Sequence, residues 1–547
     1  MKPIIYQLLP RTFANYNETR RHNGTLQENG SGTLNAITPK ALRAIRDLGA
    51  THVWYTGVIR HATAQYNTPA IVKGKAGSPY AITDYYDIDP DLCEDKRRRM
   101  QEFTDLVERS HKANLQVIID FVPNHVAREY HSACKPKGVV DLGANDNPEW
   151  AFSPLNNFYY MGEPFAPHFD VEGYQENPAR ATGNDCFTAH PSKDDWYETV
   201  KLNYGVFYQN GGEQQFDPIP DTWHKMLHIL LFWASKGIDG FRCDMAEMVP
   251  EAFWTWAIAQ VKEQYPDMLF IAEVYNPERY RAYIAAGFDY LYDKVGMYDY
   301  LRGVTSKNWA AEGITQQWQA VDDIRQHMLY FLENHDEQRI ASDFFAANAE
   351  RALAALIISA TIDTQPFMLY AGQELGERGM DKEGYSGVDG RTTIFDYWSV
   401  DTLRRWKGDG NYTGELLTES EKELQAFYSK ILNLCNSSKA LQSGLFYGLQ
   451  YANPHCDKYD SNHIYSYLRG NRNELLLIVT NFSDCDKECE VTVPEEAFAF
   501  FGATYSNSLQ KAKELISDKE TEVYLNPIDK VAVTVPANSG IILEFKL

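Results

Sequence analysis

The chain has 547 residues, which is too long for one ordinary domain and predicts two or three. Its formal net charge of -23 at pH 7 argues against nucleic acid or an anionic membrane surface as a partner, because both need a basic face. No apolar run reaches the roughly 18 residues of a membrane-spanning helix.

The first ten residues contain one lysine and a short apolar run that Gln7 and Pro10 interrupt, which is typical of a strand and not of a signal peptide. This predicts a cytoplasmic protein, and export of a form whose signal has been removed stays open. The eight cysteines are scattered without the spacing of a zinc site.

Apolar runs alternate with helical patterns along most of the chain. A helix start at Thr38-Pro39, for example, follows the first run, with Thr38 as the N-cap. The runs begin at Ile4, His52, Gln116, Gly237, Met268, Phe288, Met328 and Thr364. Eight strands separated by helices predict an α/β protein with a (β/α)8 TIM barrel.

Two segments depart from this alternation. Between residues 126 and 215, Pro, Gly, Asn and Trp are frequent and no helical stripe lasts, which predicts an inserted loop-rich domain after the third strand. Near the C-terminus, short alternating runs predict an antiparallel β-sandwich. The predicted domains are residues 1–125 with 216–435 for the barrel, 126–215 for the insert, and 436–547 for the β-sandwich.

Polar residues follow the apolar runs at several predicted strand ends. They are Asp120, Asn124 and His125 after the third run, Arg242 and Asp244 in the fourth, Glu273 at the end of the fifth, and His335 and Asp336 after the seventh. Active sites of such barrels lie at the C-terminal ends of the strands, so we expect these side chains to meet on one rim.

Cleavage of a glycosidic bond with retention needs this set of groups. Asp244 is the candidate nucleophile, because Arg242 lies two residues back on the same strand face and favours its charged form. Glu273 ends an apolar run, where desolvation favours a protonated acid that assists the leaving oxygen. Asp336 can bind sugar hydroxyls more tightly as positive charge develops on the ring.

The same stretches carry a resemblance to a known family. Asp120-Phe-Val-Pro-Asn-His125, Gly240-Phe-Arg-Cys-Asp244, Ile271-Ala-Glu273 and Glu333-Asn-His-Asp336 resemble, in order, the four signature regions of the α-amylase family of glycoside hydrolases. Residues 196–204 resemble the fifth region. Gly77-Ser-Pro-Tyr80 is similar to the loop whose Tyr stacks on the sugar at the cleavage site.

The resemblance implies a role for each matching residue. Asp244 is the nucleophile, Glu273 the general acid/base and Asp336 the stabiliser of the transition state. Arg242, His125, His335 and Tyr80 are residues of the sugar-binding subsite, and Asp120 is a buried acid that helps to hold the site together. Asn124 matches a position that often helps to bind calcium between the barrel and the inserted domain. The chemistry itself requires no cofactor, so a structural calcium is the one metal implied.

Three positions, at two places in the chain, differ from common members of the family. Many α-amylases have Lys-His three and four residues beyond the nucleophile, whereas this chain has Glu247-Met248, so its acceptor subsites differ and one usual backbone ligand of calcium changes. Ala81 follows Tyr80 where many α-glucosidases have an Asp that binds a terminal sugar, which favours endo-action.

Three functions remain after this comparison. The first is hydrolysis of α-1,4-glucosidic bonds in starch, glycogen or maltodextrins. The second is transfer by the same residues to a sugar acceptor, as in a glucanotransferase or maltosyltransferase. The third is a non-catalytic carbohydrate-binding relative, a class that usually loses one of the three acids, all of which are present here. The expected partner in each case is an oligo- or polysaccharide of α-linked glucose.

Overall fold

The computed structural model describes residues 2–546 and contains a closed barrel of eight parallel strands. In chain order these are β1 (Ile4–Leu8), β2 (His52–Tyr55), β5 (Gln116–Phe121), β10 (Gly240–Cys243), β11 (Leu269–Ala272), β12 (Tyr290–Tyr292), β13 (Met328–Phe331) and β14 (Phe367–Tyr370). The predicted (β/α)8 barrel is confirmed. Several strands start later than predicted; β14 begins only after Pro366, which has no N–H to donate to a ladder.

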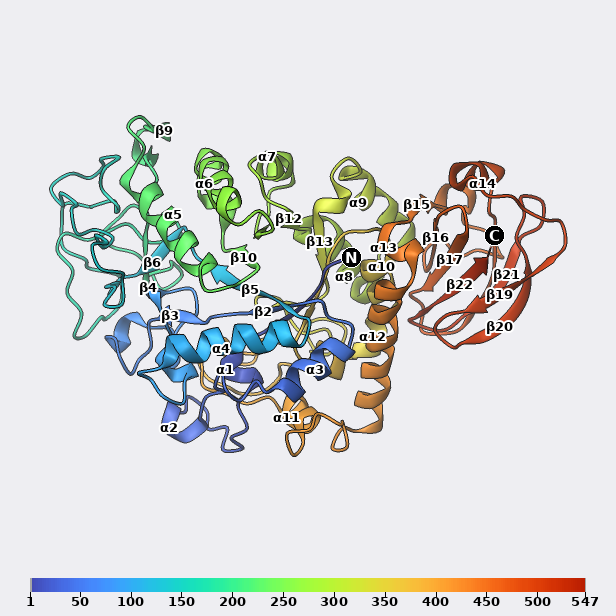
Figure 1. Cartoon of the computed structure of the whole chain (residues 1–547), viewed down its shortest axis with the longest axis horizontal. Helices are drawn as coiled ribbons and strands as arrows, with labels where there is room; N and C mark the ends of the chain where they lie inside the picture. Colours follow the sequence, from blue (N-terminus) through green and yellow to red (C-terminus); the bar gives the residue numbers. More distant parts are fainter. Residues whose placement is uncertain (1, 547) are drawn as a thin grey trace.

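Helices surround the barrel (Figure 1). The longer ones are α3 (Pro39–Asp47), α4 (Arg99–Lys112), α5 (Asp221–Ala234), α6 (Glu251–Gln264), α8 (Asp299–Lys307), α10 (Leu353–Thr361) and α12 (Glu419–Ser437). Shorter ones are α1 (Pro10–Phe13), α2 (Leu26–Asn29), α7 (Tyr280–Ala285), α9 (Ile314–Ala320) and α11 (Asp401–Lys407). Two further short helices lie beside the C-terminal strands and not around the barrel (Figure 1): α13 (Lys439–Ser443) and α14 (Glu495–Phe501). The predicted cap of α3 is present, since the Thr38 side chain accepts a hydrogen bond from Ala41 N.

Large side chains fill the inside of the barrel below the rim. They come from alternate positions of the strands and include Ile5, Trp54, Ile118, Ile271, Tyr292, Leu329, Phe331 and Met368. A second, larger core lies between the strands and the helices. The polar groups at the strand ends therefore lie directly above a tightly packed apolar layer inside the barrel, as expected for this fold.

The chain between β5 and α5 is loop-rich, as the sequence predicts. It holds the short strands β6 (His125–Ala127), β7 (Thr199–Lys201), β8 (Val206–Phe207) and β9 (Glu213–Gln214), and residues 126–215 contain no α-helix. β6 pairs with β7 in antiparallel register, which puts His125 opposite Lys201. β3 (Ile59–His61) and β4 (Ile82–Ile88) form another antiparallel pair beside it. The boundaries 126 and 215 stay a prediction.

The C-terminal region forms two antiparallel sheets around one core. The larger sheet has the order β15-β16-β17-β22-β19-β20 and the smaller is β18-β21. Their bounds are β15 (Leu445–Gly448), β16 (Ile464–Gly470), β17 (Glu474–Asn481), β18 (Lys487–Val491), β19 (Leu509–Glu514), β20 (Lys519–Tyr524), β21 (Val531–Val535) and β22 (Gly540–Lys546). The predicted start at residue 436 falls within α12, which runs to Ser437.

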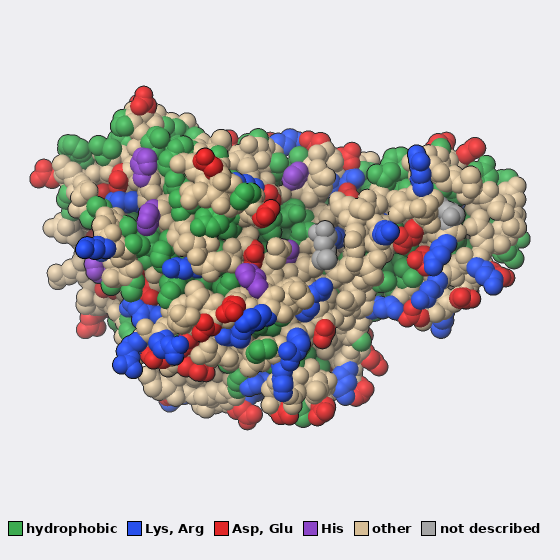
Figure 2. Space-filling view, in the orientation of Figure 1, with side chains coloured by type: hydrophobic (Ala, Val, Ile, Leu, Met, Phe, Trp, Pro, Cys, Tyr) green, Lys and Arg blue, Asp and Glu red, His purple; other side chains and the backbone are tan. Residues whose placement is uncertain are grey.

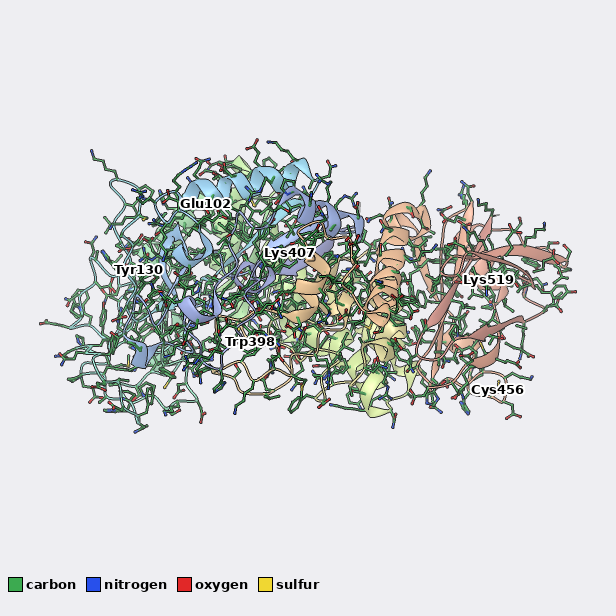
Figure 3. All side chains as sticks on the ribbon, turned by 90° about the horizontal axis from the view of Figure 1, so that it is seen from below. Glu102, Tyr130, Trp398, Lys407, Cys456 and Lys519 are labelled. Carbon is green, nitrogen blue, oxygen red and sulfur yellow. The ribbon has the colours of Figure 1, made fainter. Side chains whose placement is uncertain are left out.

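The inserted segment and the C-terminal sheets lie at opposite ends of an elongated molecule (Figure 1). The view from below shows Tyr130 of the insert and Lys519 of β20 far apart on the two sides of the barrel (Figure 3). Acidic and basic side chains are interspersed on the face that Figure 2 shows. Across residues 2–546, no helix has both the length and the apolar character that crossing a bilayer requires.

Candidate active site

The polar residues that end the strands meet at one rim of the barrel. Arg242 of β10 is in register with Asp120 of β5, and Asp244 follows directly after β10. Glu273 follows directly after β11, and Asp336 lies in the loop after β13. The first four are buried, whereas the Asp336 side chain is 45% exposed. The predicted convergence on one rim is therefore present.

Arg242 is the centre of this group. Its Nη1 lies 2.7 Å from Asp244 Oδ1 and its Nη2 lies 2.8 Å from Glu273 Oε2. Asp120 Oδ1 is 3.6 Å from the same Nη1, and Nε donates to the Tyr292 hydroxyl at 3.2 Å. One buried guanidinium thus spans the two carboxylates that a retaining glycosidase needs beside each other.

Glu273 accepts hydrogen bonds on both oxygens. The Tyr275 hydroxyl donates to Oε1 at 2.5 Å, and the backbone N–H of Met245 donates to Oε2 at 2.8 Å. Met245 has a φ of 42°, in the left-handed region that side chains other than glycine adopt at a cost. The strained turn after β10 therefore aims its N–H at the candidate acid. Sequence reasoning missed both donors, because no residue pattern marks a Met in this conformation.

Burial gives Asp244, Asp336 and Asp120 a higher pKa than an isolated carboxyl group. Burial raises the pKa of Asp244 well above its usual value; Arg242 opposes this shift and the Glu273 charge adds to it. Desolvation and the Glu273 charge raise the pKa of Asp336 to about 7, although solvent at its exposed side screens part of the effect. Burial likewise raises the pKa of Asp120 to about 6, against the pull of Arg242. The cluster as a whole therefore retains a proton near neutral pH.

Tyr80 and His335 form a stacked, hydrogen-bonded pair. The Tyr80 hydroxyl lies 2.6 Å from His335 Nε2, and the two ring centroids are 5.2 Å apart. The same hydroxyl donates to Asp120 Oδ1 at 3.3 Å. Burial, with Arg242 nearby, lowers the pKa of His335 well below its usual value, so this ring is neutral at neutral pH.

His125 belongs to the same site and is also neutral. Burial, followed by the charges of Lys201 and Lys73, lowers the pKa of His125 to about 3. Its ring lies 5.4 Å from the ring of Trp196 in the inserted segment. A neutral imidazole suits hydrogen bonding to uncharged sugar hydroxyls.

A cavity of about 230 Å³ joins these groups. Its lining residues are Lys73, Ser78, Tyr80, His125, Trp196, Glu198, Thr199, Asp244, Met245, Glu273, Tyr275, Asp336, Ile394 and Phe395. The walls thus come from the loop before β4, from the inserted segment and from the loop after β14. Lys73 and Phe395 belong to no signature region, and Glu198 lies in the stretch 196–204 that resembles the fifth one without having been singled out; only the folded chain brings the three to the cavity.

Asn124 is completely buried, but the oxygens around it already hold a cation. The ammonium of Lys201, which is 1% exposed, contacts Asn124 Oδ1, lies 2.7 Å from Asp185 Oδ1 and donates to the backbone oxygen of Met248 at 3.2 Å. A calcium ion among these three oxygens would meet the ammonium at close range. The residues present therefore do not fit the calcium that the resemblance implies.

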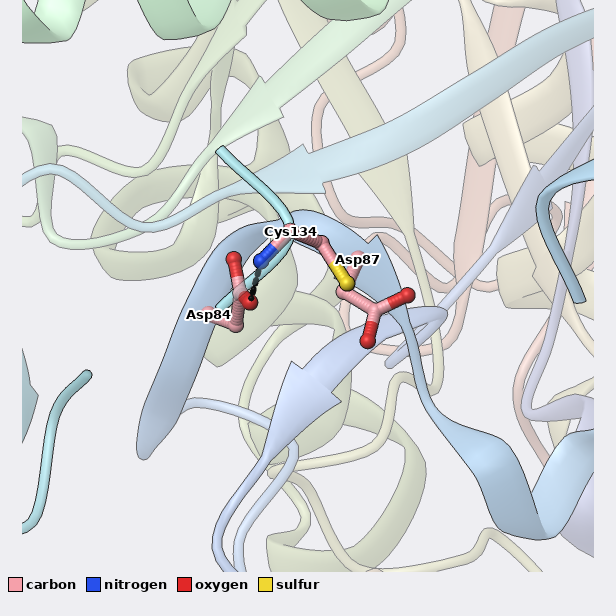
Figure 4. A group of neighbouring side chains, drawn as sticks. All are labelled: Asp84, Asp87 and Cys134. Atoms are coloured by element: carbon pink, nitrogen blue, oxygen red, sulfur yellow. Dashed lines mark hydrogen bonds between the residues drawn. The ribbon is translucent and has the colours of Figure 1, made fainter. Parts of the chain in front are cut away.

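A second group of possible metal ligands, Asp84, Asp87 and Cys134, also has protein partners (Figure 4). Asp84 accepts from Cys134 N at 2.9 Å, and the Asp87 carboxylate accepts from Arg60 at 3.1 Å and from Arg99 at 2.8 Å. Because arginine and backbone donors occupy these carboxylates, the group acts as a structural tie between β4 and the inserted segment.

Comparison with known proteins agrees with this arrangement. Residues 7–407 match the family described as "Alpha amylase, catalytic domain". The chain is 23% identical over 474 residues to Alpha-amylase 3 of Dictyoglomus thermophilum, covering 81% of this chain and 78% of that protein. It is 26% identical over 322 residues to the alpha-1,4-glucan:maltose-1-phosphate maltosyltransferase of Cereibacter sphaeroides, covering 55% of this chain and 38% of that protein.

The fold is also similar to solved structures. A noncanonic maltogenic alpha-amylase of Thermotoga neapolitana superposes with a TM-score of 0.65 at 20% identity, covering 100% of this chain and 99% of that one. The family match spans well over half of the 547 residues, and the rim holds the residues that the signature regions contribute. This chain belongs to the α-amylase family of glycoside hydrolases.

Proposed function

We propose that the chain is a retaining glycoside hydrolase that cleaves α-1,4-glucosidic bonds in starch, glycogen or maltodextrins. The observation that carries this proposal is the contact of one buried arginine, Arg242, with both Asp244 and Glu273 in the cavity that Asp336 also lines. Relatives named alpha-amylase support an α-glucan as the substrate.

In the first step, the Asp244 carboxylate attacks the anomeric carbon while the bond to the leaving oxygen breaks. Glu273 gives its proton to that oxygen, so the cluster's proton must lie on Glu273 when the sugar is in place. The products are a glycosyl ester on Asp244 and a shortened chain with a new hydroxyl. Asp336 hydrogen-bonds the sugar hydroxyls more strongly as positive charge grows on the ring.

In the second step, Glu273 takes a proton from water and the oxygen of that water attacks the anomeric carbon. The ester bond breaks, Asp244 leaves as a carboxylate, and two inversions give net retention. Arg242 stabilises the released carboxylate. Tyr80, hydrogen-bonded to His335, offers its ring face to the sugar.

A second candidate is transfer of the glycosyl group to a sugar hydroxyl in place of water. It uses the same residues, and the relative named as a maltosyltransferase supports it. Glu247, at a position where the acceptor subsite differs from that of many α-amylases, is held in place by two hydrogen bonds. Its carboxylate accepts from Asn276 N at 3.1 Å, and its backbone oxygen accepts from Arg279 at 2.9 Å.

We also propose that no calcium ion ties the inserted segment to the barrel, because the Lys201 ammonium supplies the positive charge there. This lysine links Asp185 of the insert with the turn after the nucleophile strand. No metal takes part in the chemistry described above.

The experiment that tests the proposed reaction is a timed product analysis on maltoheptaose and soluble starch, with Glu273→Gln as the control. Hydrolysis raises the total of reducing ends and shortens the products. Transfer gives products longer than the donor with reducing ends nearly constant. Absence of turnover in the wild type would overturn both candidates, and full activity of Glu273→Gln would overturn the assignment of the acid.

A further inference from the structure

Lys73, which is partly buried, and Glu198, which is buried, form an ion pair in the wall of the catalytic cavity. Lys73 Nζ lies 2.9 Å from Glu198 Oε1, and the two side chains are 16% and 6% exposed. Lys73 comes from the loop before β4, and Glu198 directly precedes β7 in the inserted segment. Both residues line the cavity with Tyr80, His125 and the three candidate catalytic acids.

One oxygen of this pair has no partner within the described chain. Glu198 is only 5% exposed, and its Oε2 atom is buried and accepts no hydrogen bond. A buried carboxylate oxygen without a donor is costly unless a ligand supplies one. The Lys73 ammonium has three N–H groups, and among residues 2–546 Glu198 Oε1 is its single carboxylate partner. Among the residues that line the cavity, a carboxylate oxygen without a donor thus lies beside an ammonium with N–H groups to spare.

The wall that carries the pair is continuous. Ala76 N donates to the Phe395 backbone oxygen at 2.9 Å, which ties the Lys73 loop to the loop after β14. On the other side, Thr68 hydrogen-bonds Glu129 of the inserted segment through its N–H and its hydroxyl, at 2.9 and 2.7 Å. A glucan chain that passes this way meets a wall formed by the loop, the insert and Phe395.

We propose that Lys73 and Glu198 bind the hydroxyls of the last sugar at the non-reducing end of the donor chain, so that the enzyme cuts from chain ends. An internal sugar carries a glycosidic bond at O4, whereas a terminal sugar has a free hydroxyl there. That hydroxyl donates to Glu198 Oε2 and accepts from the Lys73 ammonium. This inference rests on the proposed cleavage of α-glucans, and it replaces the endo-action that Ala81 suggested from the sequence.

The test compares two substrates that differ only at the non-reducing end: 4-nitrophenyl α-maltoheptaoside and its 4,6-O-ethylidene derivative. We expect the wild type to cleave the free form at least about 100-fold faster, because a site built around a hydroxyl rejects its blocked analogue. Lys73→Met and Glu198→Gln each lower kcat/KM on the free form by roughly 10- to 100-fold, as expected for the loss of a charged hydrogen bond. Most of this loss appears in KM, and the preference for the free end falls.

Lys75→Met is the matched control, because Lys75 lies exposed on the same loop. The thermal midpoint of each variant shows whether loss of the Lys73–Glu198 ion pair weakens the attachment of the loop to the insert. If Lys73→Met does not fold, the nearly isosteric Glu198→Gln provides the same test. Equal cleavage of both substrates by the wild type would overturn the terminal-sugar site alone. So would variants that keep the full end preference and lose only thermal stability. Cleavage of neither substrate would overturn the proposed function as well.

Discussion

Arg242 Nη2 lies 2.8 Å from Glu273 Oε2, on a guanidinium whose other terminal nitrogen contacts the carboxylate of Asp244. The charge of this arginine is shared between the candidate acid and the candidate nucleophile. The ammonium of a lysine is a single point of charge and does not present two separate nitrogens to two carboxylates. The identity of residue 242, and not only its charge, is therefore tied to the proposed reaction.

Arg242→Lys is expected to lower kcat by at least about 100-fold, because an ammonium does not pair with two separated carboxylates at once. Initial rates on maltoheptaose measure this effect. Arg281→Lys is the matched control, since Arg281 pairs with Asp323 on the surface. A kcat for Arg242→Lys within a few-fold of the wild type would contradict the shared-charge arrangement.

The roles of Glu273 and Asp244 are separable by the choice of leaving group. Glu273→Gln is expected to lose about 10³-fold on maltoheptaose, whose leaving oxygen needs a proton, and much less in the release of fluoride from α-maltosyl fluoride. Asp244→Asn loses both reactions. Intact-mass spectrometry of Glu273→Gln with the fluoride is expected to detect a glycosyl adduct on Asp244. Equal losses on the two donors would contradict the assignment of the acid.

The Lys201 contacts predict that stability is independent of calcium. EDTA leaves the thermal midpoint of the wild type unchanged, and Lys201→Met lowers the free energy of unfolding by about 3 kcal/mol, because it leaves Asn124 and Asp185 without their cation. Calorimetry with and without EDTA measures both effects. Lys112→Met, at an exposed ion pair with Glu108, is the control. A drop of the wild-type midpoint in EDTA would contradict the proposal.

Asp293 provides a pH test of stability away from the catalytic acids. The residue is 1% exposed, and burial raises its pKa to about 6 in the folded chain. The unfolded chain releases this proton near pH 4, so between about pH 4 and 6 the folded state binds more protons and stability falls as pH rises. Asp293→Asn removes this fall, so its stability relative to the wild type rises by roughly 3 kcal/mol from pH 4 to pH 8.

Urea unfolding of both proteins at pH 4, 6 and 8 measures the difference. A constant gap between the two proteins at all three pH values would contradict the raised pKa. The quantity to compare is the difference in free energy of unfolding between the wild type and Asp293→Asn. Many other carboxyl groups titrate in the same pH range, but their contributions are the same in both proteins and cancel in this difference.

The sequence alone determined the barrel and the composition of its rim. Apolar runs that alternate with helical patterns are local signals, and a parallel barrel gathers the ends of its strands at one face whatever the details of packing. This explains why Arg242, Asp244, Glu273 and His335 were expected together and lie together. The late starts of β12 and β14 show the limit of the same signals, since strand ends depend on which backbone groups find partners.

Only the tertiary structure decided the contacts that join distant segments. Lys201 meets Asp185 and the turn at Met248, and Lys73 meets Glu198, because the insert folds back over the barrel. No spacing along the chain predicts these contacts. The energy of such an ion pair depends on its burial, and that burial is produced by many surrounding residues together. The sequence thus specified which groups do the proposed chemistry, whereas the packing of the insert decided which cation lies beside Asn124 and which side chains line the cavity next to the candidate acids.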